Sequence, residues 1–195
     1  MALSTYSDLK TAVASWLNRT DLTSVIPDCV VLAESDIRND IRLPAMETLA
    51  SGTLSGNTLA QPTRYLSTRR LVVRGDVYAY VTPDRFQELD QASATEPSYT
   101  IVGQTFYMVN AKDGDAYSLL YYQGFAALSG ASDTNWLLSN APDVYLFAAC
   151  KHAATYLKSP EEEARFVALY QSAMQRVQRV EYRSNYSNTL TVRAA

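Results

Sequence analysis

The spacing of apolar residues changes twice along this chain, and the change limits the folds that it can adopt. Near the N-terminus, Leu9, Val13 and Trp16 recur three and four residues apart, which is the repeat of a helix with one buried face. From residue 45 to about 128, apolar residues instead fall in short runs rich in Val, Ile, Thr, Tyr and Phe, each ended by Gly, Pro, Asn or Asp. The helical spacing then returns. The sequence therefore predicts helices at both ends and strands between them.

Capping signals place the helices near the N-terminus. Thr5 and Asp8 have the spacing of a capping box, which predicts a helix that begins near Tyr6. Pro27 suits the first turn of a second helix, and Pro44 ends that helix.

The C-terminal part carries comparable signals. Asn140 and Asp143 resemble a capping box, which predicts a helix start there. The pair 159–160 is Ser-Pro followed by three acids, a fuller start signal for a last helix that we expect to end near Glu181. The residues after it have no period, and we predict an extended tail.

Turn signals divide the middle segment into strands. Residues 103–104 (Gly-Gln) and 112–115 (Lys-Asp-Gly-Asp) are each expected to form a tight hairpin turn. Thr82 can cap a short helix that has Pro83 in its first turn. We interpret this segment as a small antiparallel sheet, and not as a parallel array of alternating strands and helices.

These elements predict an α+β protein that is mainly α. Residues 1–44 and 129–181 are expected to form one discontinuous, antiparallel helical bundle. Residues 45–128 form a small antiparallel β-sheet inserted into it, and residues 182–195 form an extended C-terminal arm.

Composition narrows the classes of function. The net charge of −3 gives the chain no electrostatic attraction to nucleic acid or to an anionic membrane. No apolar run approaches the roughly 18 residues of a membrane span, and the first ten residues do not resemble a signal peptide. We expect a soluble protein made in the cytosol, with Cys29 and Cys150 as buried free thiols.

The sequence predicts no catalytic residue, no cofactor and no metal site. Its one histidine, His152, has no cysteine or carboxylate at metal-ligand spacing on its own helical face, so we interpret it as a solvated or core-edge residue. Asp113 and Asp115 lack the remaining ligands of a calcium loop, and residues 161–163 are acids that suit a helix start. Four clustered arginines could suggest a phosphate-binding stripe: Arg64, Arg69, Arg70 and Arg74. Two observations argue against it: acidic residues lie nearby, and the alternation of side chains along a strand would divide the arginines between its two faces.

Tyrosine is abundant, with 14 residues. Tyrosine favours protein interfaces because it has a large apolar body and a polar tip, but it is also a good strand former. For the tyrosines of the sheet, contact with a partner and burial in the core both remain open. We favour contact with a partner for Tyr182 and Tyr186, on a tail whose Leu190 and Val192 suit an arm that orders on binding; a disordered terminus is the alternative.

Two long stretches resemble one family. The opening "TYSDLKTAVASWLNRTDL" followed by "IPDCVVLAESDIRNDIR", and the half from "DAYSLLYYQGF" through "TNWLLSNAPDVYL" to "KSPEEEARFVALY", are similar to the head–tail adaptor (connector, or tail accessory factor) proteins of short-tailed bacteriophages. Residues 134–146 carry the most specific part of the resemblance, and the middle sheet the loosest.

The resemblance implies a structural virion protein at the portal–tail junction, present in the host cytoplasm during assembly. It implies a homo-oligomeric ring, usually a dodecamer, bound to the portal protein above and to tail nozzle proteins below. DNA would pass through the ring without specific binding. Trp136 and Pro142 would be structural anchors, and the portal-binding arm would comprise Tyr182, Arg183, Tyr186, Leu190, Val192 and Arg193.

Two other functions stay open from the residues. One is a tail-associated peptidoglycan hydrolase that uses Glu161 and Glu163, although residues this close on one helical turn do not face each other across a sugar ring. The other is an assembly factor that is absent from the finished virion.

Overall fold

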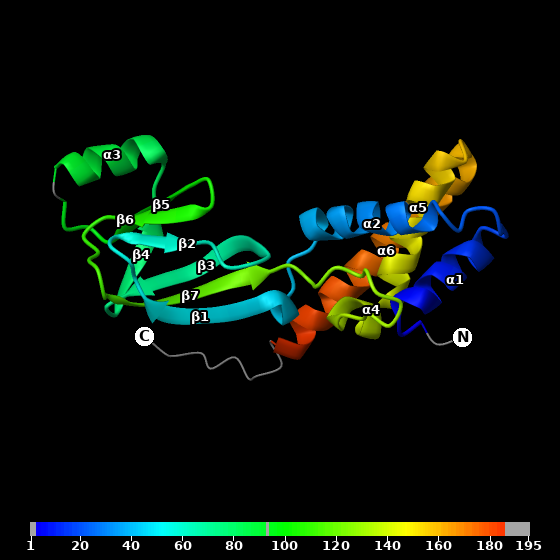
Figure 1. Cartoon of the computed structure of the whole chain (residues 1–195), viewed down its shortest axis with the longest axis horizontal. Coiled ribbons are helices and arrows are strands. Elements are labelled where there is room, and N and C mark those ends of the chain that lie inside the picture. The colour runs from blue at the N-terminus through cyan, green and yellow to red at the C-terminus, as the bar shows by residue number, and fades with distance from the viewer. Residues whose placement is uncertain (1–2, 93, 186–195) are drawn as a thin grey trace, which may run out of the picture. The chain divides into compact units, whose positions relative to one another are not determined.

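The structure is a computed structural model that describes residues 3–92 and 94–185 (Figure 1). The chain divides into two compact units. Met1–Ala45 and Phe125–Ala195 form the helical unit, and Met46–Gly124 forms the sheet unit.

The helical unit is built around α5 (Pro142–Tyr156), which packs against α1 (Tyr6–Trp16), α2 (Ile26–Asp40), α4 (Trp136–Asn140) and α6 (Pro160–Asn185). Every residue of α5 from Val144 to Cys150 is buried. Several of the buried residues are small, which lets neighbouring helices approach α5 closely. This stretch of α5 is apolar all round and has to be covered on all sides, and the other four helices pack around α5.

The start signals of the first two helices are confirmed. The Thr5 hydroxyl accepts a hydrogen bond from the Asp8 backbone N–H, and the Asp8 carboxylate accepts one from the Thr5 N–H, which completes the capping box of α1. Pro27 lies in the first turn of α2. There it costs no hydrogen bond, because the first N–H groups of a helix have no intrahelical partner.

Two boundaries near the C-terminus differ from the prediction. Asn140 does not cap the helix that follows; it is the last residue of α4, a short helix that the sequence pattern did not reveal. Helix α6 continues to Asn185, four residues past the expected end, so Tyr182 and Arg183 belong to the helical backbone rather than to an extended arm. Glu161–Glu163 occupy the first turn of α6, where their charge complements the helix dipole.

The sheet unit contains seven strands. A short 3₁₀ turn, Pro44–Met46, precedes them, and α3 (Pro83–Gln91), capped by Thr82 as predicted, lies between the fourth and fifth. The strands are β1 (Glu47–Thr53), β2 (Thr58–Ala60), β3 (Tyr65–Val73), β4 (Asp76–Tyr80), β5 (Ser98–Val102), β6 (Thr105–Met108) and β7 (Ala116–Gln123).

The expected fold class is wrong. The strand order is β1-β7-β3-β4-β5-β6-β2, a mixed seven-stranded sheet in which β4 and β5 run parallel, rather than a small antiparallel sheet attached to a mainly helical protein. The parallel pair exists because the chain crosses over through α3 between these two strands. Residues 103–104 do form the predicted hairpin turn, whereas 112–115 form a turn between β6 and β7, which do not pair with each other.

The sheet curls around its own core. The rings of Tyr65 on β3 and Phe106 on β6 lie 5.6 Å apart, although two strands separate β3 from β6 in the sheet order. Phe106 is fully buried. The tyrosines of the sheet divide between core and surface: Tyr78, Tyr99, Tyr121 and Tyr122 are buried, while Tyr80 and Tyr107 are exposed.

Candidate functional site

The loop that joins the sheet unit to α4 is organised by Asn135. Its side-chain oxygen accepts a hydrogen bond from the Leu138 N–H and caps α4. Its side-chain nitrogen donates to the Ala126 carbonyl and to the Tyr145 hydroxyl, both at 2.8 Å. One side chain therefore connects the loop, α4 and the buried face of α5. Asn135 was not among the predicted site residues, although its place before a Trp-Leu-Leu run is the position of an N-cap.

Two further contacts fix this loop to the helices. The Leu128 N–H donates to the Glu34 carboxylate on α2 at 2.8 Å, and burial raises the pKa of Glu34 above its ordinary value despite that hydrogen bond. The Tyr6 N–H at the start of α1 donates to the Asp133 carbonyl. The loop is therefore part of the packed helical unit.

The two predicted anchor residues lie at either end of α4. The Trp136 ring stacks on Phe125 with centroids 5.9 Å apart and an interplanar angle of 9°. Pro142 stands in the first turn of α5 and separates it from α4. Helix α4 therefore has the Phe125–Trp136 stack at its N-terminal end and the first turn of α5 just after its C-terminal end.

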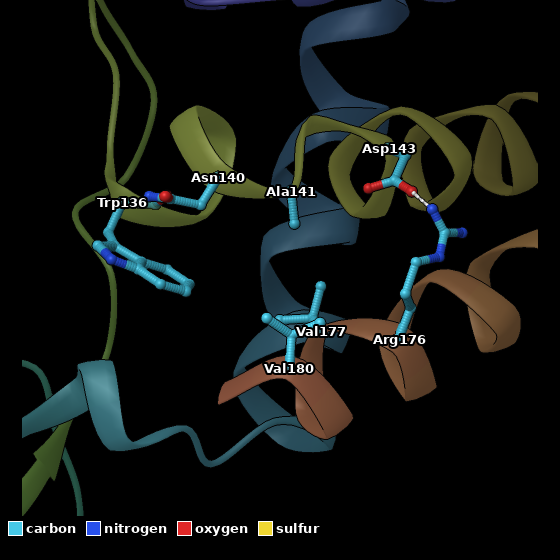
Figure 2. Close-up of a pocket in the computed structure, with 7 residues that line it drawn as sticks. All are labelled: Trp136, Asn140, Ala141, Asp143, Arg176, Val177 and Val180. Carbon is cyan, nitrogen blue, oxygen red and sulfur yellow. Dashed lines mark hydrogen bonds and ion pairs between the residues drawn. The ribbon is translucent and has the colours of Figure 1, made fainter. Parts of the chain in front are cut away.

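A pocket of about 220 Å³ opens beside Trp136 (Figure 2). Trp136, Asn140, Ala141 and Asp143 line it from α4 and the start of α5, and Arg176, Val177 and Val180 line it from α6. Val180 is 60% exposed, whereas Val177 is buried. Figure 2 shows the Trp136 ring and both valines turned toward the opening between α4 and α6.

The pocket has apolar walls and a neutralised charged rim. Arg176 donates a 2.9 Å hydrogen bond to the Asp143 carboxylate across the rim. The remaining walls are the Trp136 ring, Ala141, the valines and one uncharged polar residue, Asn140. Such a pocket is suited to aliphatic side chains rather than to a charged ligand.

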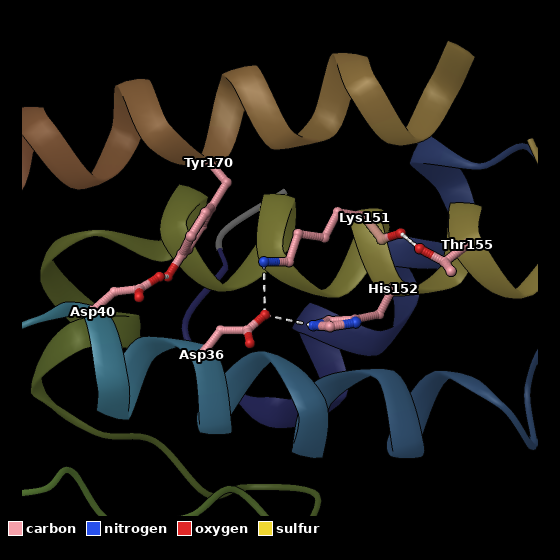
Figure 3. Close-up of polar contacts among 6 residues, drawn as sticks. All are labelled: Asp36, Asp40, Lys151, His152, Thr155 and Tyr170. Carbon is pink, nitrogen blue, oxygen red and sulfur yellow. Dashed lines mark hydrogen bonds and ion pairs between the residues drawn. The ribbon is translucent and has the colours of Figure 1, made fainter. Parts of the chain in front are cut away.

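A second cluster joins α2 to α5 and α6 (Figure 3). One oxygen of the Asp36 carboxylate lies 2.6 Å from Lys151 Nζ and 2.6 Å from His152 Nε2. Lys151 also lies over the Tyr170 ring, 4.6 Å from its centroid, and the Tyr170 hydroxyl donates to Asp40 at 3.0 Å. These contacts link three helices through charged and aromatic groups on the edge of the core.

The pKa values in this cluster follow from burial and hydrogen bonding. Burial alone raises the pKa of Asp36, but hydrogen bonds from Lys151 and His152 outweigh it, and the pKa lies below its ordinary value. Burial raises the pKa of Tyr170, and the neighbouring Asp40 carboxylate raises it further. The arrangement favours a charged Asp36 and a neutral tyrosine.

His152 has a carboxylate partner, which the sequence pattern did not show because Asp36 is supplied by another helix. Among residues 3–92 and 94–185, no group of three His, Cys, Asp or Glu side chains is placed to hold a metal ion. The His152 contact is a hydrogen bond between α5 and α2 within this cluster. Both cysteines are buried as free thiols.

The other charged groups that the sequence singled out lie in the sheet unit or at its turns. Asp113 accepts a hydrogen bond from the Gly56 N–H, and Asp115 accepts one from the Lys112 N–H. Both are turn-stabilising contacts. Arg69 pairs with Glu47, and Arg74 with Asp115.

Of the predicted arm residues, Tyr182 and Arg183 lie on α6, and Tyr186, Leu190, Val192 and Arg193 lie outside the described residues. No helix in the described part of the chain is long and apolar enough to cross a membrane.

Comparison with known families gives one result that spans both units. Residues 4–193 match the family model described as SU10 adaptor protein. No curated protein matches the chain.

Proposed function

Since the chain belongs to the SU10 adaptor protein family, and is therefore a phage head–tail adaptor, we propose that it assembles as a ring between the capsid portal and the tail. The match over residues 4–193 is the observation that carries this proposal, because it spans the helical unit and the sheet unit together. The ring is a homo-oligomer of twelve copies, located in the virion at the portal–tail junction, with tail nozzle proteins below it.

Exposed apolar side chains support assembly. In a cyclic ring each copy uses two different surfaces, one toward each neighbour. On the helical unit, Val31 and Leu32 of α2 are 60% and 50% exposed, and Trp16 of α1 is 47% exposed. Val180 of α6 supplies another exposed apolar position. Large apolar side chains that a single copy leaves in water are the kind of group that neighbouring copies cover.

We propose that DNA passes through the ring without specific binding. The chain carries a net charge of −3, so it provides no general attraction for a polyanion. Arg69 and Arg74, two of the four clustered arginines, are engaged with carboxylates of their own unit.

The portal contact is assigned to the C-terminal arm. We propose that Tyr182 and Arg183 approach the portal from the end of α6, and that Tyr186, Leu190, Val192 and Arg193 complete the contact. Trp136 and Pro142 serve as anchors that keep the loop and α4 in place while the arm is engaged. The aromatic stack of Trp136 on Phe125 supports this assignment.

The test is binding to a purified portal ring, followed by light scattering of the complex. The full chain and a version that ends at Asn185 are each mixed with the portal, because the shorter version keeps all of α6. We expect the full chain to co-migrate with the portal at twelve copies per ring and to be a monomer when alone. Loss of binding on truncation supports the arm as the contact. Failure of the full chain to bind contradicts the proposed function.

A further inference from the structure

We propose that the pocket between α4, α5 and α6 binds residues 186–195 of the same chain before the protein meets its partner. The pocket would hold the apolar side chains of this segment, Leu190 and Val192, against the Trp136 ring and the α6 valines. This goes beyond the adaptor role, because it concerns the unassembled protein and can be tested without a portal.

The segment starts close enough to reach the pocket. Val180 lines the pocket, and α6 ends at Asn185, which is about 7.5 Å further along the helix axis at 1.5 Å per residue. Leu190 is five residues beyond Asn185, and five residues extend up to about 17 Å. The chain can therefore reverse direction after α6 and place Leu190 over Val180 with length to spare.

The chemistry of the segment fits the pocket. Residues 186–192 are uncharged, which suits a pocket whose only charged pair, among the lining residues, is already neutralised as Arg176–Asp143. Leu190 and Val192 are two residues apart, so in an extended chain their side chains point to the same side, with Thr191 on the other. At about 220 Å³ the pocket is smaller than the range typical for drug-sized ligands, and aliphatic side chains fit it better.

The same chain is a better source for the segment than a second copy in dilute solution. A tether of a few residues gives the segment an effective concentration near the pocket in the millimolar range, far above that of a separate molecule. Docking of the segment would also cover Val180, which is otherwise 60% exposed. A partner that binds the arm would then have to displace it from the pocket first.

The experiment is disulfide trapping in the full chain. Val180→Cys is combined with Leu190→Cys, and Arg179→Cys with Leu190→Cys serves as the matched control. Arg179 is also exposed and is one residue from Val180, but it does not line the pocket. Cys29 and Cys150 are buried and stay in both variants.

We expect the 180–190 pair to form an intramolecular disulfide about tenfold faster than the 179–190 pair, since a docked segment holds only the first pair within bonding range. The product should be a monomer at every protein concentration. Equal rates for the two pairs would show an undocked segment and overturn the proposal. Disulfides that form only between chains would assign the pocket to a second copy and would also overturn it.

Discussion

The side-chain nitrogen of Asn135 donates a 2.8 Å hydrogen bond to the hydroxyl of Tyr145, a tyrosine that is only 2% exposed in the middle of the helical unit. A buried hydroxyl without a hydrogen-bond partner destabilises the fold, and a helix without an N-cap leaves its first backbone N–H groups unsatisfied. The Asn135 side chain answers both needs, since its nitrogen donates to Tyr145 and its oxygen caps α4 through the Leu138 N–H. Together with the contacts of Leu128 and Asp133, it fixes the loop on a tightly packed core.

Replacing Asn135 with alanine should destabilise the helical unit by about 2–3 kcal/mol, because it removes the α4 cap and the hydrogen bond to Tyr145 together. Urea unfolding followed by tryptophan emission is the suitable measurement, since Trp16 and Trp136 both lie in the helical unit. Asn140→Ala is the control. The Asn140 side chain donates a hydrogen bond to the Trp136 carbonyl on the exposed side of α4. We expect its removal to lower the free energy of unfolding by about 0.5 kcal/mol or less. Equal losses for the two variants would contradict the role given to Asn135.

Replacing Asp36 with asparagine should cost about 1–2 kcal/mol at pH 6, because Lys151 and His152 lose the carboxylate that they share. Asp28→Asn is the matched control on the same helix, at an exposed position in the first turn. We expect it to cost a few tenths of a kcal/mol through the helix dipole.

The contribution of Asp36 should also depend on pH. Its folded-state pKa is lowered below the unfolded value, so its stabilisation is present above the ordinary aspartate range and is lost as the pH falls through the folded pKa. The difference in unfolding free energy between the wild-type protein and Asp36→Asn should therefore shrink between about pH 5 and pH 3. A difference that grows as the pH falls through this range would refute this assignment.

The thiol of Cys150 should be unreactive in the folded protein. Burial raises its pKa to about 12, with a further contribution from Cys29, so almost no thiolate is present at pH 8. We expect modification by a disulfide reagent to be about a hundredfold slower in buffer than in denaturant. Ser35→Cys, on the exposed face of α2, should react at once and shows that the reagent is active.

Truncating Phe106 should loosen the curled sheet. It is fully buried between Tyr65 and Tyr99, and Phe106→Ala should cost about 3–5 kcal/mol, whereas Phe106→Leu should cost about 1 kcal/mol. Hydrogen exchange of the β5 and β6 amides measures the effect within the sheet unit. Unchanged protection in Phe106→Ala would mean that β6 does not contribute to the core as the ring contacts indicate.

Features encoded within a few residues could be predicted. The Thr5–Asp8 capping box, the Thr82 cap and the turn at 103–104 each depend on side chains or backbone geometry three or fewer residues apart. A local pattern contains all the information that such features need.

Features that depend on residues far apart in the chain could not be predicted from the sequence. β4 and β5 pair in parallel because α3 carries the chain back to the end of the sheet at which β4 began. The amino-acid composition of a strand does not show in which direction it runs beside its neighbour. The contact of His152 with Asp36 joins residues 116 positions apart, so no spacing on one helix could show it. The end of α6 was misplaced because residues 182–185 have weak helical signals of their own, and the helix continues through them nonetheless.

The insertion of the sheet unit between the two parts of the helical unit sets an order of events during synthesis. Helices α1 and α2 leave the ribosome first, before α5, the helix that both of them pack against, has been made; residues such as Leu9, Val13 and Val30 are buried only in the folded protein. Residues 46–124 take roughly 4–16 s to be made at about 5–20 residues per second. During those seconds the nascent chain presents two apolar helix faces, and the sheet unit stays incomplete until β7, which pairs with both β1 and β3, has been made. The sheet unit is thus made before α5, the helix that packs against α1, α2, α4 and α6, and the helical unit can close only after α5 and then α6 have followed.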